Sequence, residues 1–340
     1  MNFSLILPLL LHTFKSEHDL IKSIEELSQK FTENRSKIND YLSDKRLVSA
    51  YTAFYLTTNL PKFNAVLEWM PEAWLEELKT SHLIDLGAGP GTYSLAFREW
   101  LGKEAQGMTQ VETSPVMREQ ASKLWQGLYP KEKMNQSLTV KNSDKKFLLF
   151  GHSANEMGAK KAIEYIQDIN PEHILFIEPG MKDFFPVMLE IREFLIKQGY
   201  NVLFPCPQPV PCPMAGTQDW CHQFVYVKQS AEIERLSQMA KKDRRLLPLT
   251  VQAFTRSDLK ASAAERVVRV LPETKFSLEW EVCVGDHVDH YQIMKRSYEK
   301  KTLKQLDEVL AGAAVGTALD KQIENTKRVK LLTVNKKSIS

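Results

Sequence analysis

Cysteine is scarce in this sequence, with only four among 340 residues. A secreted domain held together by disulfides needs a much higher density of cysteine, so that class is excluded. Long apolar runs are also missing, because the longest one, residues 5–11, is far shorter than the roughly 20 residues that span a bilayer. No lysine or arginine precedes this run and no small-residue cleavage site follows it, so we expect no secretory signal. The overall composition is that of an ordinary globular, intracellular protein.

An excess of either charge is also missing, since the 45 basic and 42 acidic side chains leave a formal net charge of only +3. The distribution is uneven, however. Residues 206–340 contain 22 basic and 16 acidic side chains, whereas the remainder of the chain is slightly acidic. A basic region of this kind is either an electrostatic surface for phosphate backbones or an ordinary solvated face.

The periodicity of apolar residues changes along the chain. In the first 80 residues they recur at spacings of three and four, which predicts helices. From residue 82, short apolar runs alternate with helical segments, which indicates a parallel sheet covered on both faces. Residues 266–271 and 276–284 favour antiparallel strands, and the lysine-rich end favours a tail or an exposed helix. We therefore predict an α/β protein with an N-terminal helical region (1–80), a Rossmann-like domain (81–205), a cysteine-containing module with β-strands (206–310) and a basic tail (311–340).

Three glycines at alternate positions follow an apolar strand and precede a helix. Gly87, Gly89 and Gly91 permit positive φ and let a ligand approach the backbone, while the new helix offers unpaired N–H groups. Asp85 precedes the first glycine by two residues, and Glu112 ends the next apolar stretch, where a carboxylate accepts hydrogen bonds from ribose hydroxyls. This order resembles the S-adenosylmethionine site of Rossmann-like methyltransferases, whereas nicotinamide enzymes usually have G-x-G-x-x-G. We therefore predict a class I methyltransferase fold in which these five residues bind the cofactor.

The methyltransferase pattern is incomplete further along the chain. Residues 137–140 are the candidate third strand, with Asn142 or Asp144 as the contact to adenine, but too few residues follow for a covering helix. Beyond the fourth apolar run, residues 151–156 replace the Asn/Asp-Pro-Pro-aromatic sequence of nucleic-acid amino-methyltransferases. His152 in this segment is either a base or a cap of the following helix. No catalytic residue is identified.

All four cysteines lie in the C-terminal half, and three of them, Cys206, Cys212 and Cys221, fall within 16 residues. Prolines at alternate positions from 205 to 213 stiffen this segment, and Cys-Pro is familiar at cluster ligands. Four thiolates hold either zinc or an iron–sulfur cluster, and the close C-x2-C pairs of structural zinc sites are absent, which favours the larger group with Cys283 as a remote ligand. Buried unligated cysteines and a Cys3His zinc site with His222 are the alternatives.

Together these features resemble the methyltransferase-like family of small-ribosomal-subunit assembly proteins, which has mitochondrial and bacterial members. The resemblance extends from about Tyr51 to about Cys283. It rests on residues 51–61, the glycine turn, residues 176–180, the cysteine–proline segment and the late strand cysteine. Two departures are visible: Asn59 stands where the family usually has arginine, and the third-strand region is short.

The resemblance implies a [4Fe–4S] cluster held by Cys206, Cys212, Cys221 and Cys283, with zinc as the alternative metal. It implies an assembly factor that associates with small-subunit rRNA and with the small-subunit precursor. The alternative is an active S-adenosylmethionine-dependent rRNA methyltransferase. We expect a monomer without a membrane partner, located in a bacterial-type cytoplasm rather than in the mitochondrial matrix. The candidate rRNA contacts are Lys241, Lys242, Arg244, Arg245, Lys295, Arg296, Lys300 and Lys301.

Overall fold

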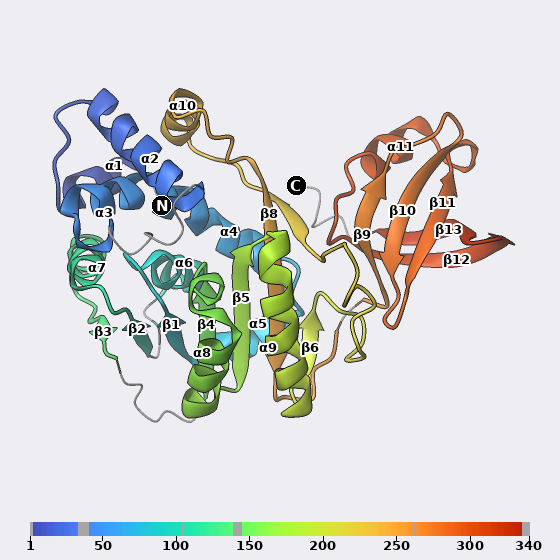
Figure 1. Cartoon of the computed structure of the whole chain (residues 1–340), viewed down its shortest axis with the longest axis horizontal. Helices are drawn as coiled ribbons and strands as arrows, with labels where there is room; N and C mark the ends of the chain where they lie inside the picture. The colour runs from blue at the N-terminus through green and yellow to red at the C-terminus, as the bar shows by residue number, and fades with distance from the viewer. Residues whose placement is uncertain are drawn as a thin grey trace. The chain divides into compact units, whose positions relative to one another are not determined.

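The computed structural model describes residues 3–32, 41–103, 105, 107–138, 145–261 and 263–334. The chain divides into two compact units. Unit 1 comprises Met1–Ala65, Lys79–Ser153 and Val227–Leu246, whereas unit 2 comprises Val66–Leu78, Ala154–Tyr226 and Leu247–Ser340. Each unit contains both helices and strands, which Figure 1 labels in chain order.

Unit 1 begins with a series of helices. Its elements are α1 (Phe3–Ile6), η1 (Leu7–Leu9), α2 (Glu17–Thr32), α3 (Lys45–Tyr51), the π-helical turn η3 (Thr52–Leu56) and α4 (Thr57–Leu67). Asp44 starts α3, because its Oδ1 accepts hydrogen bonds from the backbone N–H groups of Arg46 at 2.8 Å and Leu47 at 3.3 Å. The apolar residues that recur along this region, among them Leu20, Leu47 and Phe54, are buried.

The sheet of unit 1 is wholly parallel. Its strands are β1 (His82–Leu86), β2 (Met108–Val111), β3 (Asn135–Gln136) and β4 (Lys146–Gly151), in the order β3-β2-β1-β4. The helices α6 (Thr92–Leu101) and α7 (Pro115–Leu128) connect the strands, and α10 (Ala231–Met239) returns to this unit later in the chain. The central runs of β1 and β4 are buried, as the continuous apolar sequence predicted for strands covered on both faces.

The third strand is shorter than expected and lies earlier in the chain. Only Asn135–Gln136 pairs with β2, and the predicted strand at residues 137–140 is not formed at Ser137 and Leu138. These two residues follow a polar pair, so the strand gains little from burial of apolar side chains. The candidate adenine contacts Asn142 and Asp144 lie outside the described residues.

Unit 2 contains a second group of strands with one reversed member. Its elements are α5 (Glu72–Lys79), α8 (Ala154–Ile169), β5 (His173–Pro179), η4 (Lys182–Phe184), α9 (Phe185–Lys197), β6 (Asn201–Phe204), β7 (Gln223–Tyr226) and β8 (Leu246–Thr255). Strand β8 lies between β5 and β6 and is antiparallel to both, and β7 also pairs with β8. Glu178 at the end of β5 caps α8, since its Oε1 accepts a hydrogen bond from the N–H of Ala154 at 2.9 Å.

These two strand orders are those of the two halves of a class I methyltransferase sheet. The first half has the order β3-β2-β1-β4, and the second has an antiparallel strand inserted between two parallel ones. The predicted mixed α/β fold class is therefore confirmed. The sheet does not end at residue 205, however, because β8 joins it after the cysteine segment.

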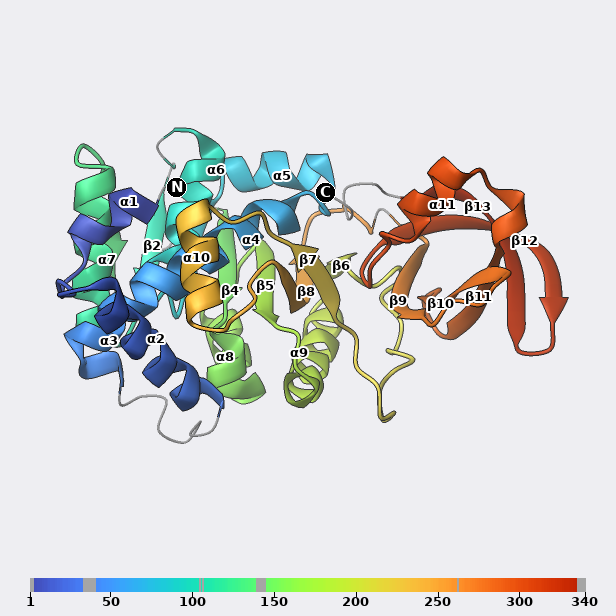
Figure 2. The ribbon, with the colours of Figure 1, turned by 90° about the horizontal axis from the view of Figure 1, so that it is seen from above.

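The end of unit 2 forms a closed five-stranded barrel. Its strands are β9 (Glu265–Leu271), β10 (Ser277–Cys283), β11 (Val288–Met294), β12 (Ala314–Ile323) and β13 (Thr326–Val334), in the closed order β10-β11-β13-β12-β9. The helical segments η5 (Lys295–Ser297) and α11 (Lys300–Leu306) connect β11 to β12. Strands β11 and β13 are parallel and the other pairs are antiparallel. Counted from β9, the order is 1-2-3-5-4, which is the topology of the OB-fold (Figure 2).

The barrel contradicts the expectation of a basic tail at residues 311–340. Both β12 and β13 lie in that range, and Val315 and Val329 pack in the barrel interior with Trp280 and Ile293. The strands are hard to recognise in the sequence because half of the residues of β12 are exposed and no alternation of apolar and polar residues is present. Residues 335–340 lie outside the described part of the chain.

Candidate functional site

The three glycines of unit 1 form the turn between β1 and α6. Their φ angles are +71° at Gly87, +54° at Gly89 and +86° at Gly91, a region that other residues rarely adopt. A Cβ atom at Gly87 would lie 2.5 Å from Ser153 Cβ, and one at Gly91 would lie 2.5 Å from Gln110 Nε2. At Gly89 no atom lies within 4 Å of the added Cβ. Packing against Ser153 therefore requires glycine at position 87, and the φ of +86° favours it at position 91, whereas Gly89 borders open space where a ligand can approach.

Glu112 lies directly beside this turn. Its Oε2 accepts a hydrogen bond from the N–H of Gly89 at 2.8 Å, and its Oε1 accepts one from the N–H of Ser114 at 2.8 Å. The parallel register of β1 and β2, which pairs Leu86 with Val111, brings the two segments together. The carboxylate thus lies at the edge of the sheet where the sequence predicted it, next to the glycine that borders open space.

Asp85 points away from solvent and has a structural role in the turn. Its buried Oδ2 accepts hydrogen bonds from the backbone N–H of Ser94 at 2.9 Å and from the Ser94 hydroxyl at 2.7 Å. These bonds tie the end of β1 to the first turn of α6. Burial raises the pKa of Asp85 to about 6, and the Ser94 hydrogen bonds oppose that shift only in part.

His152 lies in a buried, cationic environment in unit 1. Its Nε2 is 3.2 Å from Nζ of Lys62, and its ring stacks on that of Tyr93 with centroids 6.3 Å apart. Burial lowers the pKa of His152 well below its ordinary value, and the charges of Lys62 and Arg244 lower it further. The imidazole is therefore neutral at pH 7, and its Nε2 accepts from the ammonium group. The predicted cap of α8 is supplied by Glu178 instead.

The basic residues predicted to contact RNA in unit 1 differ in environment. All four line one groove, which Gln229, Glu234, Ser237, Gln238 and Asp243 complete. Lys241 is exposed, and Arg245 forms an exposed ion pair with Asp243 at 2.8 Å. Arg244 differs, because it is largely covered: its Nη2 donates to Asn59 Oδ1 at 3.2 Å and its guanidinium lies over the ring of Tyr55. Burial lowers the pKa of Arg244.

The basic residues predicted in unit 2 lie on the barrel. Lys295 begins η5 and pairs with Glu273 at 2.7 Å, so its charge is already compensated. Arg296, Lys300 and Lys301 are exposed on η5 and α11. The basic residues of the barrel and those of the groove are described separately, because the former belong to unit 2 and the latter to unit 1.

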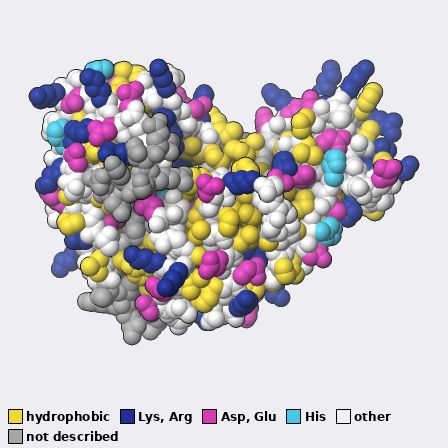
Figure 3. Space-filling view, viewed as in Figure 1, with side chains coloured by type: hydrophobic (Ala, Val, Ile, Leu, Met, Phe, Trp, Pro, Cys, Tyr) yellow, Lys and Arg dark blue, Asp and Glu magenta, His cyan; other side chains and the backbone are white. Residues whose placement is uncertain are grey.

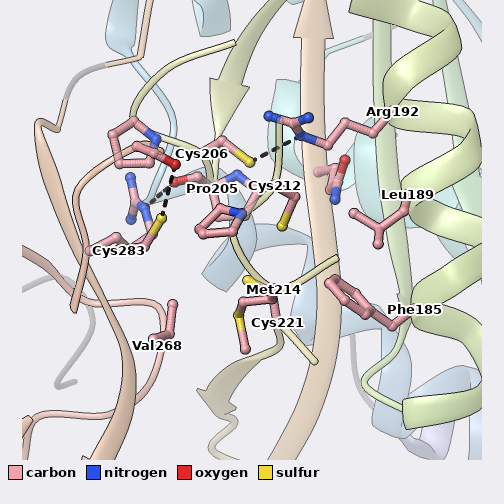
Figure 4. Close-up of a pocket in the computed structure, with 15 residues that line it drawn as sticks. Phe185, Leu189, Arg192, Pro205, Cys206, Cys212, Met214, Cys221, Val268 and Cys283 are labelled. Atoms are coloured by element: carbon pink, nitrogen blue, oxygen red, sulfur yellow. Dashed lines mark hydrogen bonds between the residues drawn. The ribbon is translucent and has the colours of Figure 1, made fainter. Parts of the chain in front are cut away.

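The four cysteines, which come from separate segments of unit 2, line one pocket (Figure 4). Cys206, Cys212 and Cys221 lie in the segment between β6 and β7, and Cys283 ends β10 of the barrel. All four are free and partly buried. Burial raises the pKa of Cys212 and Cys221, and it raises that of Cys283 to about 11, so these three thiols are neutral at pH 7 in the absence of a metal.

Two arginines border the cysteine pocket. Arg192 of α9 donates from Nε to Cys206 Sγ at 3.3 Å, as the dashed line in Figure 4 marks, and pairs with Glu193. Arg266 of β9 is fully buried and donates to the carbonyl oxygens of Pro205 and Gly312. In the described part of the chain no carboxylate forms an ion pair with Arg266. A guanidinium buried without a counter-charge is unfavourable, and the four neighbouring thiols are groups that can become anionic.

The cysteine pocket offers sulfur donors, which both zinc and iron–sulfur clusters use. Among the described residues no group of three or more His, Cys, Asp or Glu side chains is placed to hold a metal ion. The walls of the pocket include Phe185, Leu189 and Met214, which exclude water. His222 is not part of the lining, which weakens the Cys3His alternative.

Sequence reasoning missed Arg192, Arg266 and Lys62 as parts of these sites. Arg192 had a recognisable signal, because it follows Phe185 by seven residues and shares the buried apolar face of α9 with Met188. Arg266 is the second residue of the apolar strand β9, a position that only weakly indicates that its side chain is buried. Nothing in the spacing of Lys62 identifies its contact with a histidine 90 residues away.

Comparisons with known proteins identify one family and several distant structures. The family model described as "Mitochondrial small ribosomal subunit Rsm22" matches residues 45–306. No curated protein matches the chain. Among solved structures, a putative RNA methyltransferase from Pyrococcus horikoshii is 14% identical and covers 56% of this chain and 84% of its own, with a TM-score of 0.35. The magnesium protoporphyrin IX methyltransferase from Synechocystis PCC 6803 is 12% identical, with coverages of 66% and 100% and a TM-score of 0.40.

The family match confirms the predicted resemblance and corrects the predicted location. We expected a bacterial-type cytoplasm, and that expectation is wrong, because the matching family is described as mitochondrial and points to the mitochondrion. The matched residues include the glycine turn and all four cysteines. Within the described part of the chain, no helix has the length and apolar character needed to cross a bilayer.

Proposed function

We propose that this chain, which belongs to the Rsm22 family of the mitochondrial small ribosomal subunit, is an rRNA-binding assembly factor with a methyltransferase-like domain and a [4Fe–4S] cluster. The observation that carries the proposal is the family match over residues 45–306. The matched region contains a glycine turn with preserved geometry and a pocket that four cysteines line. The basic groove and the basic barrel segment are candidate contacts with rRNA phosphates.

Co-sedimentation tests the ribosomal part of this proposal. Full-length tagged protein should migrate with small-subunit precursors in a density gradient and dissociate as the salt concentration rises. Replacing both Lys241 and Lys242 with glutamine should lower the fraction that co-sediments. The matched control is the pair Lys160→Gln and Lys161→Gln, which removes the same charge from the exposed surface of α8. Migration only with free protein, at low salt as well, would refute the proposal.

The cluster would be held by Cys206, Cys212, Cys221 and Cys283. Bound iron and sulfide would convert the thiols to thiolates and give the site a net charge of about −2. The two arginines of the pocket, Arg192 and Arg266, would then be the counter-charges, which explains why a guanidinium is buried there. The chemistry supplied is a covalent cross-link, which would fasten the barrel strand β10 to the segment between β6 and β7.

Metal analysis after anaerobic purification tests this assignment. We expect about four iron and four sulfide per chain, with a broad visible absorbance. Cys221→Ser should remove most of the iron, whereas Met214→Leu, which alters the same pocket without removing a thiol, should retain it. Stoichiometric zinc without sulfide would favour the zinc alternative. A colourless, metal-free protein would refute both.

Methyl transfer to rRNA is the second candidate activity, and the open space at Gly89 favours it. A ligand at that position would lie against the backbone of Gly89 and beside the Glu112 carboxylate, which accepts the Gly89 N–H. The Gly89→Arg variant should fill this space and abolish binding, whereas Gly102→Arg, which also has positive φ and no neighbouring atoms, should not. Calorimetric titration with S-adenosylmethionine measures binding directly, and labelled methyl transfer to precursor rRNA measures activity. Failure to bind at millimolar concentration would eliminate this candidate.

A further inference from the structure

The OB-type barrel at the end of unit 2 contributes Arg266 and Cys283 to the cysteine pocket, and the rest of its surface belongs to neither site described above. Five-stranded barrels of this topology bind oligonucleotides with strands 2 and 3 and with the loops that follow strands 1 and 4. Because fold alone does not establish function, the side chains on these strands and loops decide what the barrel can bind. In this barrel the loop after strand 1 connects β9 to β10.

That loop presents an aromatic ring to solvent on a rigid turn. Phe276 is 65% exposed, although it is among the most apolar residues of the barrel. The turn is closed by the hydrogen bond from Thr274 N to the Ser277 carbonyl, and Thr274 Oγ1 accepts from the N–H of Phe276. The carbonyl of Phe276 in turn accepts from Lys295 N at 2.9 Å. These three hydrogen bonds hold the backbone at Phe276, so the exposed ring projects from an ordered turn.

Basic side chains surround this ring and the segment bonded to it. The ammonium of Lys275 lies 5.6 Å from the Phe276 ring centroid. Lys295 links the turn to η5 and α11, where Arg296, Lys300 and Lys301 are exposed. Residues 295–304 contain five basic side chains and one acidic one. Figure 3 shows lysine and arginine side chains gathered over this end of the barrel.

The outer face of β10 and β11 is less suited to an anionic ligand. Glu279 and Glu281 both point outward there. Glu279 accepts from Gln292 at 3.2 Å and contacts His290 at 2.8 Å, and Glu281 pairs with Arg269 at 3.1 Å. These contacts form a self-contained polar network. Charge complementarity therefore favours the loop end of the barrel, around Phe276, as the place where a phosphate backbone would lie.

We propose that the barrel binds a short single-stranded RNA segment, with Phe276 stacked on an unpaired base and Lys275 and Arg296 bound to the flanking phosphates. This combination of an aromatic platform and a cationic track is the general chemistry of single-strand recognition. The proposal deepens the rRNA binding proposed above, because it assigns a single-stranded element and a specific aromatic contact. It does not require the cofactor pocket or the cysteines.

Fluorescence anisotropy with the full-length protein tests the proposal, with a labelled uridine oligonucleotide as the probe. Phe276→Ala should weaken binding about 5- to 100-fold, because one base–aromatic stack is lost. Phe276→Trp should retain the affinity. Leu319→Ala is the matched control, since Leu319 is an equally exposed apolar residue (62%) on β12 of the same barrel. The double variant Lys275→Gln, Arg296→Gln should lower the salt slope by about 0.7 for each phosphate contact removed.

The outcomes separate this proposal from the proposed function. If Phe276→Ala and Leu319→Ala bind the oligonucleotide as the unaltered protein does, the stacking assignment is wrong. If the unaltered protein co-sediments with small-subunit precursors but does not bind the oligonucleotide, the barrel proposal fails while the assembly role stands. Selective loss of oligonucleotide binding by Phe276→Ala, with circular dichroism unchanged, supports the barrel as a single-strand binding module.

Discussion

Replacing Asp85 with asparagine should stabilise the protein at neutral pH. Asp85 is fully buried, and burial raises its pKa from the ordinary 3.8 to about 6. Its folded-state pKa therefore lies above its unfolded value, so the folded protein binds the proton more tightly than the unfolded chain does. Folding then carries no penalty below pH 3.8, an increasing penalty between pH 3.8 and 6, and a constant penalty above pH 6. At 1.36 kcal/mol for each pKa unit, the penalty at pH 7 is about 3 kcal/mol.

Asparagine cannot ionise, so it removes this penalty and keeps an oxygen for the two hydrogen bonds from Ser94. The amide N–H2 group that it introduces has a cost of about 1–3 kcal/mol if it finds no acceptor, but that cost is the same at every pH. Denaturant unfolding of the original protein and of Asp85→Asn between pH 4 and pH 8 measures the difference. The stability of the variant relative to the original should rise by about 2.5 kcal/mol across this range, because a small part of the penalty is already present at pH 4.

Asp243→Asn is the control of opposite sign. Hydrogen bonds from Arg245 hold the pKa of this exposed carboxylate at about 2, so removing its charge should give no gain in stability as the pH rises. A difference between Asp85→Asn and the original protein that is constant from pH 4 to pH 8 would refute the reasoning, because it would mean that the buried carboxylate does not change its protonation on folding.

Three further predictions follow from individual contacts. Gly91→Ala should lower the melting temperature and the free energy of unfolding, the latter by about 1–3 kcal/mol, because the new Cβ would displace the Gln110 side chain at a φ of +86°. Gly102→Ala, which has positive φ but open space around it, should lower the free energy of unfolding by less. Lys62→Met should raise the pKa of His152, measured by NMR titration, because the ammonium charge contributes to its depression; an unchanged pKa would contradict this. Arg266→Met should lower the iron content of anaerobically purified protein, because the counter-charge of the cysteine pocket is lost; unchanged iron would argue against that role.

The glycine turn and its carboxylate could be predicted from the sequence for a geometric reason. Parallel neighbouring strands end at the same edge of a sheet, so Glu112 at the end of β2 must lie near the turn that follows β1. That the four cysteines lie together could also be predicted, because three of them fall within one short proline-rich segment. Their two arginine neighbours were not predicted, because that contact depends on how α9 and β9 pack.

The barrel and the burial of Arg244 illustrate what local patterns do not reveal. Half of β12 is exposed and its apolar residues do not alternate with polar ones, so its strand conformation is determined by pairing with β13 and β9 and not by its own periodicity. Arg244 belongs to a basic run that is typical of a solvated surface, yet it is covered by Tyr55 and bound to Asn59. In both cases tertiary contacts override the local sequence preference.

The central claim is that this chain acts on the small ribosomal subunit by binding its rRNA. Sequencing of the RNA that cross-links to the full-length protein under ultraviolet light tests that claim most directly. The reads should concentrate at a few positions of the small-subunit rRNA, with a single-stranded segment among them. Reads spread evenly over cellular RNA, or concentrated in the large-subunit rRNA, would contradict it.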